Sequence, residues 1–160
     1  MTVEQKIKKI VDSMEGVSYL FDNWQTANIR LDKIKLPAVL NLLPVSGTFN
    51  LGRQEHVTAL TALVDNVLDP LRTWWGKPIT VNSGYRCLEL NAAVKGSKTS
   101  QHMKGEAADI DTGDRQQNKL LFEYIRKNLP YDQLIDESNF AWVHVSYRAD
   151  GDNRMQVLKL

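Results

Sequence analysis

The stretch SQHMKGEAADID, residues 100–111, places a histidine, a glycine, two alanines and two aspartates close together. Gly105 allows the backbone to turn between the loop that carries His102 and the segment that carries Asp109, because glycine tolerates backbone angles that other residues avoid. The segment EAADID is predicted to be a β-strand, in which Ala107 and Asp109 share a face. A small side chain beside a carboxylate leaves room for an ion and its substrate. We therefore interpret His102 and Asp109 as two ligands of one metal ion.

The composition limits which residues complete such a site. The chain has one cysteine, Cys87, which excludes an internal disulfide and a cysteine-based zinc site. Of its three histidines, His56 lies in a helical stretch with no motif around it. In the segment AWVHVSY the strand period places His144 on the face opposite Val143 and Val145. Two imidazoles and one carboxylate give a catalytic zinc site its three protein ligands and leave the fourth position for water. His144 is therefore the expected third ligand, although each residue alone could equally be an ordinary strand or turn residue.

The totals of the chain exclude several classes of protein. A length of 160 residues fits one compact domain, 1–160. A net charge of +1, without a basic run, gives no reason to expect nucleic-acid binding. No segment approaches the roughly 18 consecutive apolar residues of a membrane span. The N-terminal MTVEQKIKKIVDSM shows no signal peptide, because charges interrupt its apolar residues. We expect either that the chain is not exported by that route or that a signal has been removed.

Hydrophobic spacing predicts the elements around the motif. Helices and hairpins are mixed rather than strictly alternating, which is typical of the α+β class. We expect a small antiparallel sheet that bears the metal site and packs against helices. Residues 54–160 form this core, and residues 1–53 form an N-terminal extension whose structure the pattern does not define. The predicted helices span 2–14, 54–74, 88–94 and 114–128, short strands and loops occupy 17–53, and the predicted strands span 79–83, 106–111, 133–138, 141–147 and 156–160.

Helical periodicity also predicts which side chains are buried. In the helix over 54–74, Pro70 is expected to cause a kink, and the two tryptophans at its end are expected to lie in the core. The predicted buried residues of that helix are Val57, Leu60, Val64, Val67, Leu68, Leu71, Trp74 and Trp75. Those of the helix over 114–128 are Leu120, Leu121, Tyr124 and Ile125.

Three separate motifs follow one another within residues 55–148. The first is SGYR at 83–86 with the LN that follows it, the second is S-x-H-x-x-G-x-A-x-D at 100–109, and the third is W-x-H at 142–144. Together they resemble the M15 family of zinc D-alanyl-D-alanine carboxypeptidases and related peptidoglycan peptidases. The resemblance implies the hedgehog/DD-peptidase fold and one Zn²⁺ ion held by His102, Asp109 and His144.

The resemblance also implies a general base for amide hydrolysis. Such a base takes a proton from water and passes it to the leaving amine. The family pattern L-I-x-E before W-x-H places this acid at Glu137. Asp136 is the alternative, and strand alternation puts these two carboxylates on opposite faces. Some relatives carry an aspartate three residues before the last histidine, but that position is Ala141 here.

Further residues are implied to contact the substrate or the ligands. Arg86, the arginine of SGYR, is implied to bind a substrate carboxylate, since a guanidinium forms two parallel hydrogen bonds with one. A structural salt bridge is the alternative. Ser100 is implied to contact the substrate or orient the site, and it could equally cap a turn. Asp111 could accept a hydrogen bond from a ligating imidazole.

The activity implied by this resemblance is zinc-dependent hydrolysis of peptide bonds in peptidoglycan stem peptides. The two family activities are removal of the terminal D-Ala from D-Ala-D-Ala and cleavage of the L-Ala–D-Glu bond. The small size and the absent signal favour the second, endolysin-like activity, with the bacterial cell wall reached in the periplasm or through lysis or phage release. The alternative is a metal-containing cell-wall binding module of the same fold without turnover. The sequence predicts neither the localisation nor the oligomeric state.

Overall fold

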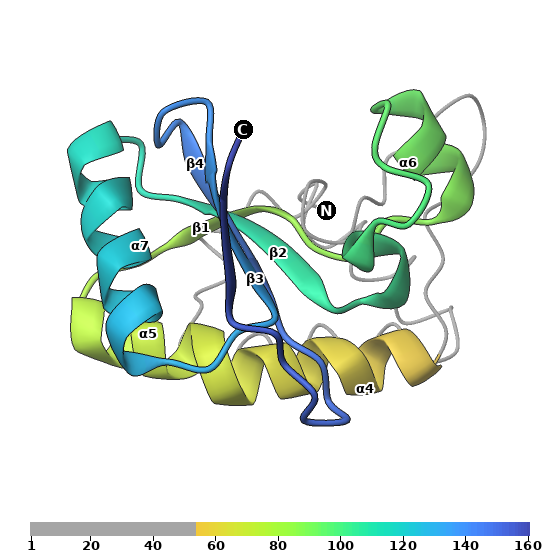
Figure 1. Ribbon diagram of the computed structural model, residues 1–160, viewed down its shortest axis with the longest axis horizontal. Helices are drawn as coiled ribbons and strands as arrows, with labels where there is room; N and C mark the ends of the chain where they lie inside the picture. The colour runs from red at the N-terminus through yellow and green to blue at the C-terminus, as the bar shows by residue number, and fades with distance from the viewer. Residues whose placement is uncertain (1–53) are drawn as a thin grey trace, which may run out of the picture.

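The structure, a computed structural model, describes residues 54–160. The helix expected at 2–14 and the strands and loops expected over 17–53 lie outside the described residues. No helix in the described part is long and apolar enough to cross a membrane. The elements, shown in Figure 1, are α4 (Gln54–Leu63), a π-helical turn η1 (Val64–Leu68), α5 (Asp69–Trp75), β1 (Thr80–Ser83), α6 (Leu88–Ala93), a 3₁₀-helix η2 (Gln101–Lys104), β2 (Ala107–Asp111), α7 (Arg115–Asn128), β3 (Gln133–Glu137), β4 (Trp142–Ser146) and β5 (Gln156–Lys159).

Five strands form one sheet in the order β1-β2-β4-β3-β5. The neighbouring pairs β1–β2, β2–β4 and β3–β4 are antiparallel, whereas β5 is parallel to β3. The α+β class is thus confirmed, and the sheet is mixed rather than wholly antiparallel. The path of the chain after β4 explains why β5 is parallel to β3. Strand β4 ends beside the beginning of β3, so a short connection leads into β5 at the same end and in the same direction.

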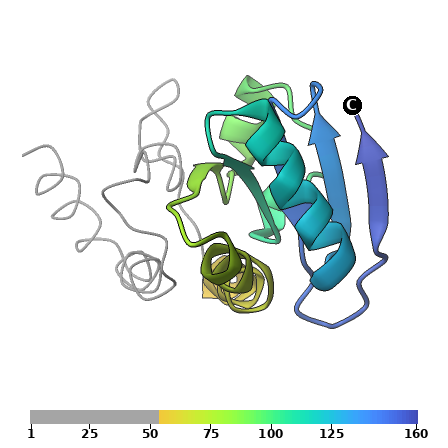
Figure 2. The same ribbon diagram turned by 90° about the vertical axis from the view of Figure 1, so that its left-hand side faces the viewer.

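Helices α4, α5 and α7 lie on one face of this sheet. The long α4–η1–α5 segment runs beneath the sheet in Figure 1, and α7 packs against β3, β4 and α5 (Figure 2). Strand alternation turns one set of side chains toward these helices. The strand residues of that core are Val81, Ala108, Ile110, Leu134, Val143 and Val145, and each is 0% exposed. The opposite face of β2 and β4 is therefore left to the motif residues.

The helix predicted over 54–74 is present, and it contains a π-helical turn. Its six predicted aliphatic core residues are all buried. Immediately before Pro70, the N–H of Asp69 donates to the carbonyl of Val64, five residues earlier. Proline has no N–H, and its ring crowds the carbonyl four residues earlier. A wider turn at this point relieves that crowding and lets the helical direction continue into α5.

Two predictions about helix faces are wrong. Leu120 is 55% exposed, and the buried face of α7 contains Asn118 instead, in line with Leu121 and Ile125. The apolar periodicity included Leu120 in the buried face of α7 and left out Asn118, because an asparagine was not counted as a core residue. The hydrogen-bond partners that allow its burial are Thr112, six residues earlier, and Phe140, 22 residues later.

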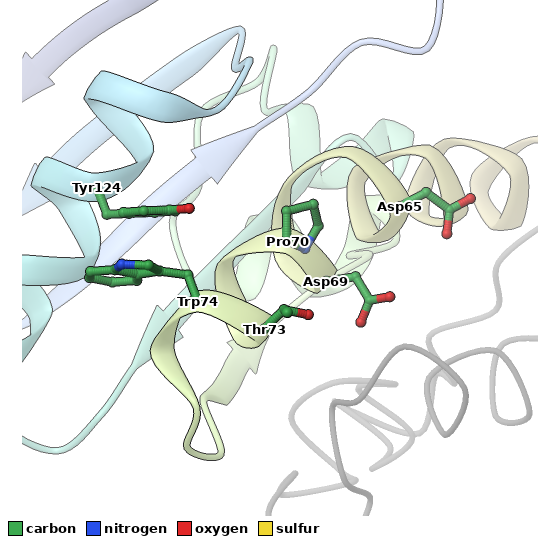
Figure 3. A pocket seen from close by; sticks show the side chains of 6 residues that line it. All are labelled: Asp65, Asp69, Pro70, Thr73, Trp74 and Tyr124. Carbon is green, nitrogen blue, oxygen red and sulfur yellow. The ribbon is translucent and has the colours of Figure 1, made fainter.

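Trp74 also departs from its predicted core position. Its side chain is 45% exposed and stacks on Tyr124 of α7, with ring centroids 3.8 Å apart. This stacked pair borders a shallow surface hollow on the helix side of the molecule (Figure 3), which is also lined by Asp65, Asp69, Pro70 and Thr73. Trp75 is partly buried against the core, as expected.

Candidate metal centre

Three side chains from the sequence motifs meet on the face of the sheet opposite α7. His102 Nε2 lies 3.2 Å from Asp109 Oδ1 and 3.2 Å from His144 Nδ1, and His144 Nδ1 lies 2.9 Å from Asp109 Oδ1. We call these three residues the ligand cluster. Within residues 54–160 it is the one group of three or more His, Cys, Asp or Glu side chains arranged closely enough to hold a metal ion.

The dimensions and chemistry of the ligand cluster fit zinc. Ligand atoms about 2.0–2.1 Å from a tetrahedral zinc ion lie about 3.3 Å from one another, close to the three distances in the cluster. Two imidazole nitrogens and one carboxylate oxygen also form a donor set that zinc accepts readily. The three residues therefore match the expected size and donor chemistry of a zinc site with a fourth position free.

Strand register brings Asp109 and His144 together. Asp109 in β2 lies directly opposite His144 in β4, and side chains directly opposite one another in antiparallel strands project from the same face. The neighbouring pairs, Ala108 with Val145 and Ile110 with Val143, face the helices. The sequence prediction that these strands present their motif side chains on one face is thus confirmed by their register.

The third member, His102, is held from the neighbouring loop. Its Nδ1 lies 2.7 Å from the carbonyl oxygen of Gly84, so an Nδ1–H group donates to that oxygen and Nε2 keeps its lone pair for the ligand cluster. The backbone N–H of Arg86 donates to the His102 carbonyl at 3.0 Å. Ser100 caps η2 by accepting the N–H of His102 at 3.3 Å. The SGYR loop and η2 thereby orient this imidazole together.

Asp111 was named above as a residue that could accept a hydrogen bond from a ligating imidazole. Its carboxylate instead accepts the N–H of Gly113 at 2.8 Å and the side-chain amide of Asn118 at 2.7 Å. The carbonyl of Gly84, and not Asp111, accepts the hydrogen bond from His102 Nδ1. The sequence could not indicate this acceptor, because it is a backbone carbonyl and every residue carries one.

Gly105 closes η2 and directs the chain into β2. Its φ is 73°, in the left-handed region, and its N–H donates to the His102 carbonyl at 3.2 Å. A Cβ at this position would lie 2.6 Å from the backbone carbonyl oxygen of His56 in α4. Glycine is thus required both for the turn and for the close approach of the loop to α4.

Burial and neighbouring charges shift the pKa values of two groups in the ligand cluster. Burial lowers the pKa of the His102 imidazole, against the opposing attraction of Asp109. Burial alone would raise the pKa of the Asp109 carboxyl, but the charges and hydrogen bonds of His102 and His144 outweigh it and hold that pKa well below its usual range. A neutral imidazole and an ionised carboxylate are the forms that bind a metal ion.

Glu137 lies on the same face as the ligand cluster. It pairs with Trp142, and Ile135 pairs with His144, so both residues of β3 share the face of that histidine. Burial, followed by the charge of Asp109, raises the pKa of the Glu137 carboxyl. Asp136 projects to the other face and accepts the N–H of Phe140. This placement favours Glu137 over Asp136 as the base.

Arg86 lies near both acids of the site. Burial lowers the pKa of its guanidinium, and the charges of Asp109 and Glu137 oppose that change. Its Nε is buried and has no hydrogen-bond partner in the described part of the chain. Asp109 and Glu137 both attract the guanidinium, and the binding of a substrate carboxylate by Arg86 stays a prediction.

Comparison with known proteins gives the family. The model of the family Peptidase M15 matches residues 43–146, well over half of the chain. The chain belongs to the peptidase M15 family. The zinc D-Ala-D-Ala carboxypeptidase of Streptomyces albus G is 49% identical to it over 39 residues. That stretch covers 24% of this chain and 15% of the relative, so this chain matches only a small part of that protein's length.

The predicted M15-type zinc peptidase is therefore confirmed at the level of the family. The structure brings together His102, Asp109 and His144 with Glu137 and Arg86 beside them, and it places Ser100 at the cap of η2. The sequence reasoning missed the buried Asn118. A signal for it was present, because Asn118 has helical spacing with Leu121 and Ile125 and so falls in the apolar stripe of α7.

Proposed function

We propose that this protein hydrolyses peptide bonds in peptidoglycan stem peptides with one zinc ion held by the ligand cluster. The observation that carries the proposal is the approach of His102 Nε2, Asp109 Oδ1 and His144 Nδ1 to 2.9–3.2 Å on the face that also bears Glu137. Membership of the M15 family supports it. The relative named zinc D-Ala-D-Ala carboxypeptidase supports both the metal and the substrate class.

Each residue of the site has a distinct chemical role in this proposal. A zinc ion, when bound, polarises the scissile carbonyl and lowers the pKa of a bound water toward neutrality. Glu137 accepts a proton from the attacking water on a carboxylate oxygen and returns it to the leaving nitrogen. Its raised pKa suits the base role, because a carboxylate with a higher pKa accepts a proton more readily, and the carboxylic acid then returns that proton to the leaving nitrogen.

Substrate recognition is assigned to Arg86 and Ser100. A stem peptide offers a terminal D-Ala carboxylate or the carboxylate of D-Glu, and the Arg86 guanidinium binds such a group through paired hydrogen bonds. The buried, unpartnered Nε of Arg86 supports this role within the described residues. Ser100, whose Oγ already accepts the His102 N–H, can donate its own hydroxyl proton to a substrate carbonyl.

The relative's name favours D-Ala-D-Ala as the cleaved bond, and the L-Ala–D-Glu bond is the other family activity. A D-Ala-D-Ala peptide and purified sacculi, each incubated with zinc-loaded protein, separate the two by their products. Free D-Ala identifies the carboxypeptidase, and new N-terminal D-Glu identifies the endopeptidase. Either activity places the site of action at the bacterial cell wall.

The base is tested with Glu137→Gln. We expect this variant to bind zinc normally and to lose activity by about 100-fold or more, since general acid–base catalysis contributes about 10²–10⁴-fold. Glu123→Gln is the matched control, because Glu123 lies on α7 in an ion pair with Arg126. Equal activity of wild type and Glu137→Gln would remove Glu137 from the mechanism. Equal inertness of the two, with retained binding to sacculi, would favour the binding module instead.

A further inference from the structure

The turn between β3 and β4 has a backbone conformation that its residues do not favour. Ser138, Asn139 and Phe140 have φ values of 51°, 56° and 60°. In this left-handed region the Cβ crowds the following carbonyl oxygen, and residues other than glycine normally adopt it singly. Three such residues in succession persist only where surrounding groups hold them.

Two charged side chains contact this turn from outside. Arg115, at the beginning of α7, donates from Nη1 to the carbonyls of Ser138 and Asn139. Asp136, in β3, accepts the N–H of Phe140. Both contacts are made to the backbone, so they stabilise the conformation of the turn rather than a particular side chain in it.

The third contact comes from the buried amide of Asn118, which is 0% exposed. Its Nδ2 donates to the carbonyls of Phe140 at 3.0 Å and Ala141 at 3.3 Å, and to Asp111 Oδ1 at 2.7 Å. Its Oδ1 accepts the N–H and the hydroxyl of Thr112, both at 2.9 Å. One amide therefore joins the end of β2, the first turns of α7 and the β3–β4 turn.

This turn begins immediately after Glu137. The N–H of Ala141 donates to the Glu137 carbonyl at 2.9 Å, and Glu137 pairs with Trp142 across the turn. A change in the turn therefore changes the direction of the Glu137 side chain. We propose that Asn118 is a positioning residue that holds the left-handed turn and so directs the carboxylate of Glu137 toward the ligand cluster. The inference rests on the proposed function, in which Glu137 is the base.

Three variants separate this role from general stability. Asn118→Asp keeps the shape and the acceptor of the side chain, but it replaces the amide donor with an oxygen that repels the carbonyls of Phe140 and Ala141 and the carboxylate of Asp111. Asn128→Asp is the matched control on the same helix, since its exposed amide donates only to the Tyr124 carbonyl among the described contacts. Arg115→Ala, at an exposed position, loosens the same turn without disturbing the core, and it serves if Asn118→Asp does not fold.

The measurements are amide hydrogen exchange at Phe140 and Ala141, zinc content, and kcat and KM on the peptide that the wild type cleaves. For Asn118→Asp and Arg115→Ala we expect exchange at least about tenfold faster, because the opened turn exposes these amides. We also expect kcat to fall about 10- to 100-fold, with KM nearly unchanged and full zinc content, as when a supporting contact of a catalytic group is lost. Asn128→Asp should match the wild type in all four quantities.

Several results would overturn the inference. They are unchanged exchange, faster exchange with unchanged kcat, and a loss of activity that is explained by lost zinc or by a raised KM alone. A wild-type protein that cleaves neither stem-peptide bond would instead overturn the proposed function. The exchange rates would still decide, in that case, whether Asn118 holds the turn.

Discussion

At the scale of single residues, the site depends on backbone groups as much as on side chains. His102 is oriented by the Gly84 carbonyl, and its loop is closed by Gly105, which approaches the backbone of His56. These contacts select the ring nitrogen that faces Asp109. A change that adds even one carbon atom to this loop therefore acts on the ligand cluster indirectly.

Gly105→Ala tests this close approach. The added methyl group meets both an unfavourable φ of 73° and the His56 carbonyl oxygen at 2.6 Å. We expect a loss of about 2–4 kcal/mol in the free energy of unfolding, made up of the left-handed strain and the clash, measured by urea denaturation. Gly113→Ala is the matched control, since Gly113 has φ 84° but nothing within 4 Å of its Cβ position. If Gly105→Ala and Gly113→Ala lowered the free energy of unfolding equally, the close approach of Gly105 to α4 would make no contribution to the loss.

The same residues show what the sequence could predict about the site. Strand alternation predicted that Asp109 and His144 project from sheet faces where they could meet, whereas the set of three ligands with His102 was implied by the resemblance to the M15 family. The bond from His102 to the Gly84 carbonyl was not predictable, because it joins residues 18 positions apart through a group that every residue has. Asn118 was missed for a related reason, since its burial depends on partners in two other segments.

At the scale of elements, the edge strand β5 is attached to the sheet by an ion pair at its beginning. Asp132, directly before β3, is buried, and its two carboxylate oxygens accept from Nε at 3.0 Å and Nη2 at 2.6 Å of Arg154. The backbone N–H of Gln156 donates to the Asp132 carbonyl at 3.0 Å. The hydrogen bonds of Arg154 hold the pKa of the Asp132 carboxyl below its ordinary value.

Arg154→Ala tests this attachment. We expect the free energy of unfolding at pH 7 to fall by about 1.5–3 kcal/mol, the usual contribution of hydrogen bonds to a charged group. Because the pKa of Asp132 is lowered by folding, the ion pair stabilises the protein above the unfolded pKa of about 3.9, and this stabilisation is lost as the pH falls through the folded value. The difference between wild type and variant should therefore shrink in acid, as measured by urea denaturation from pH 7 to pH 3.

Arg126→Ala is the control for Arg154→Ala. Arg126 forms an exposed ion pair with Glu123 on α7, and such pairs contribute about 0.5 kcal/mol or less. A similar loss in both arginine variants, or a difference for Arg154→Ala that persists at low pH, would contradict the role of the Asp132 pair.

The elements also show where periodicity is sufficient and where it fails. The apolar spacing of Val57, Leu60 and Leu71 predicted the long helical segment, since its core face repeats regularly. It did not predict the π-helical turn, which depends on how Pro70 is accommodated within the helix. Nor did it predict the parallel direction of β5 or the exposure of Trp74, because both depend on which distant element lies alongside.

At the scale of the whole molecule, the ligand cluster connects three separate elements. Its members come from η2, β2 and β4, whereas α4, α5 and α7 cover the other face of the sheet. A zinc ion that binds this arrangement and not the unfolded chain adds to the stability of the folded state. Zinc removal should therefore affect the global unfolding transition as well as the activity.

Chelation tests this coupling. With free zinc at about 100 times its Kd, binding contributes about 2.7 kcal/mol, and we expect chelation to lower Tm by about 5–10 °C for a chain of this size. His144→Gln should unfold at the same temperature with and without zinc. His56→Gln, which removes a histidine outside the ligand cluster, should keep the full zinc-dependent shift. A zinc-dependent shift that survives in His144→Gln would place the ion elsewhere.

The direct opposition of Asp109 and His144 across β2 and β4 has a consequence for folding fidelity. Sliding one strand past the other by a single position would turn one of these ligands over to the helix side. A chain with slipped pairing would then lack one of the three metal ligands. Zinc binding would therefore stabilise only chains in which β2 and β4 pair in the correct register. Zinc supplied during refolding should accordingly increase the fraction of chains that reach the correct strand register, independently of any substrate.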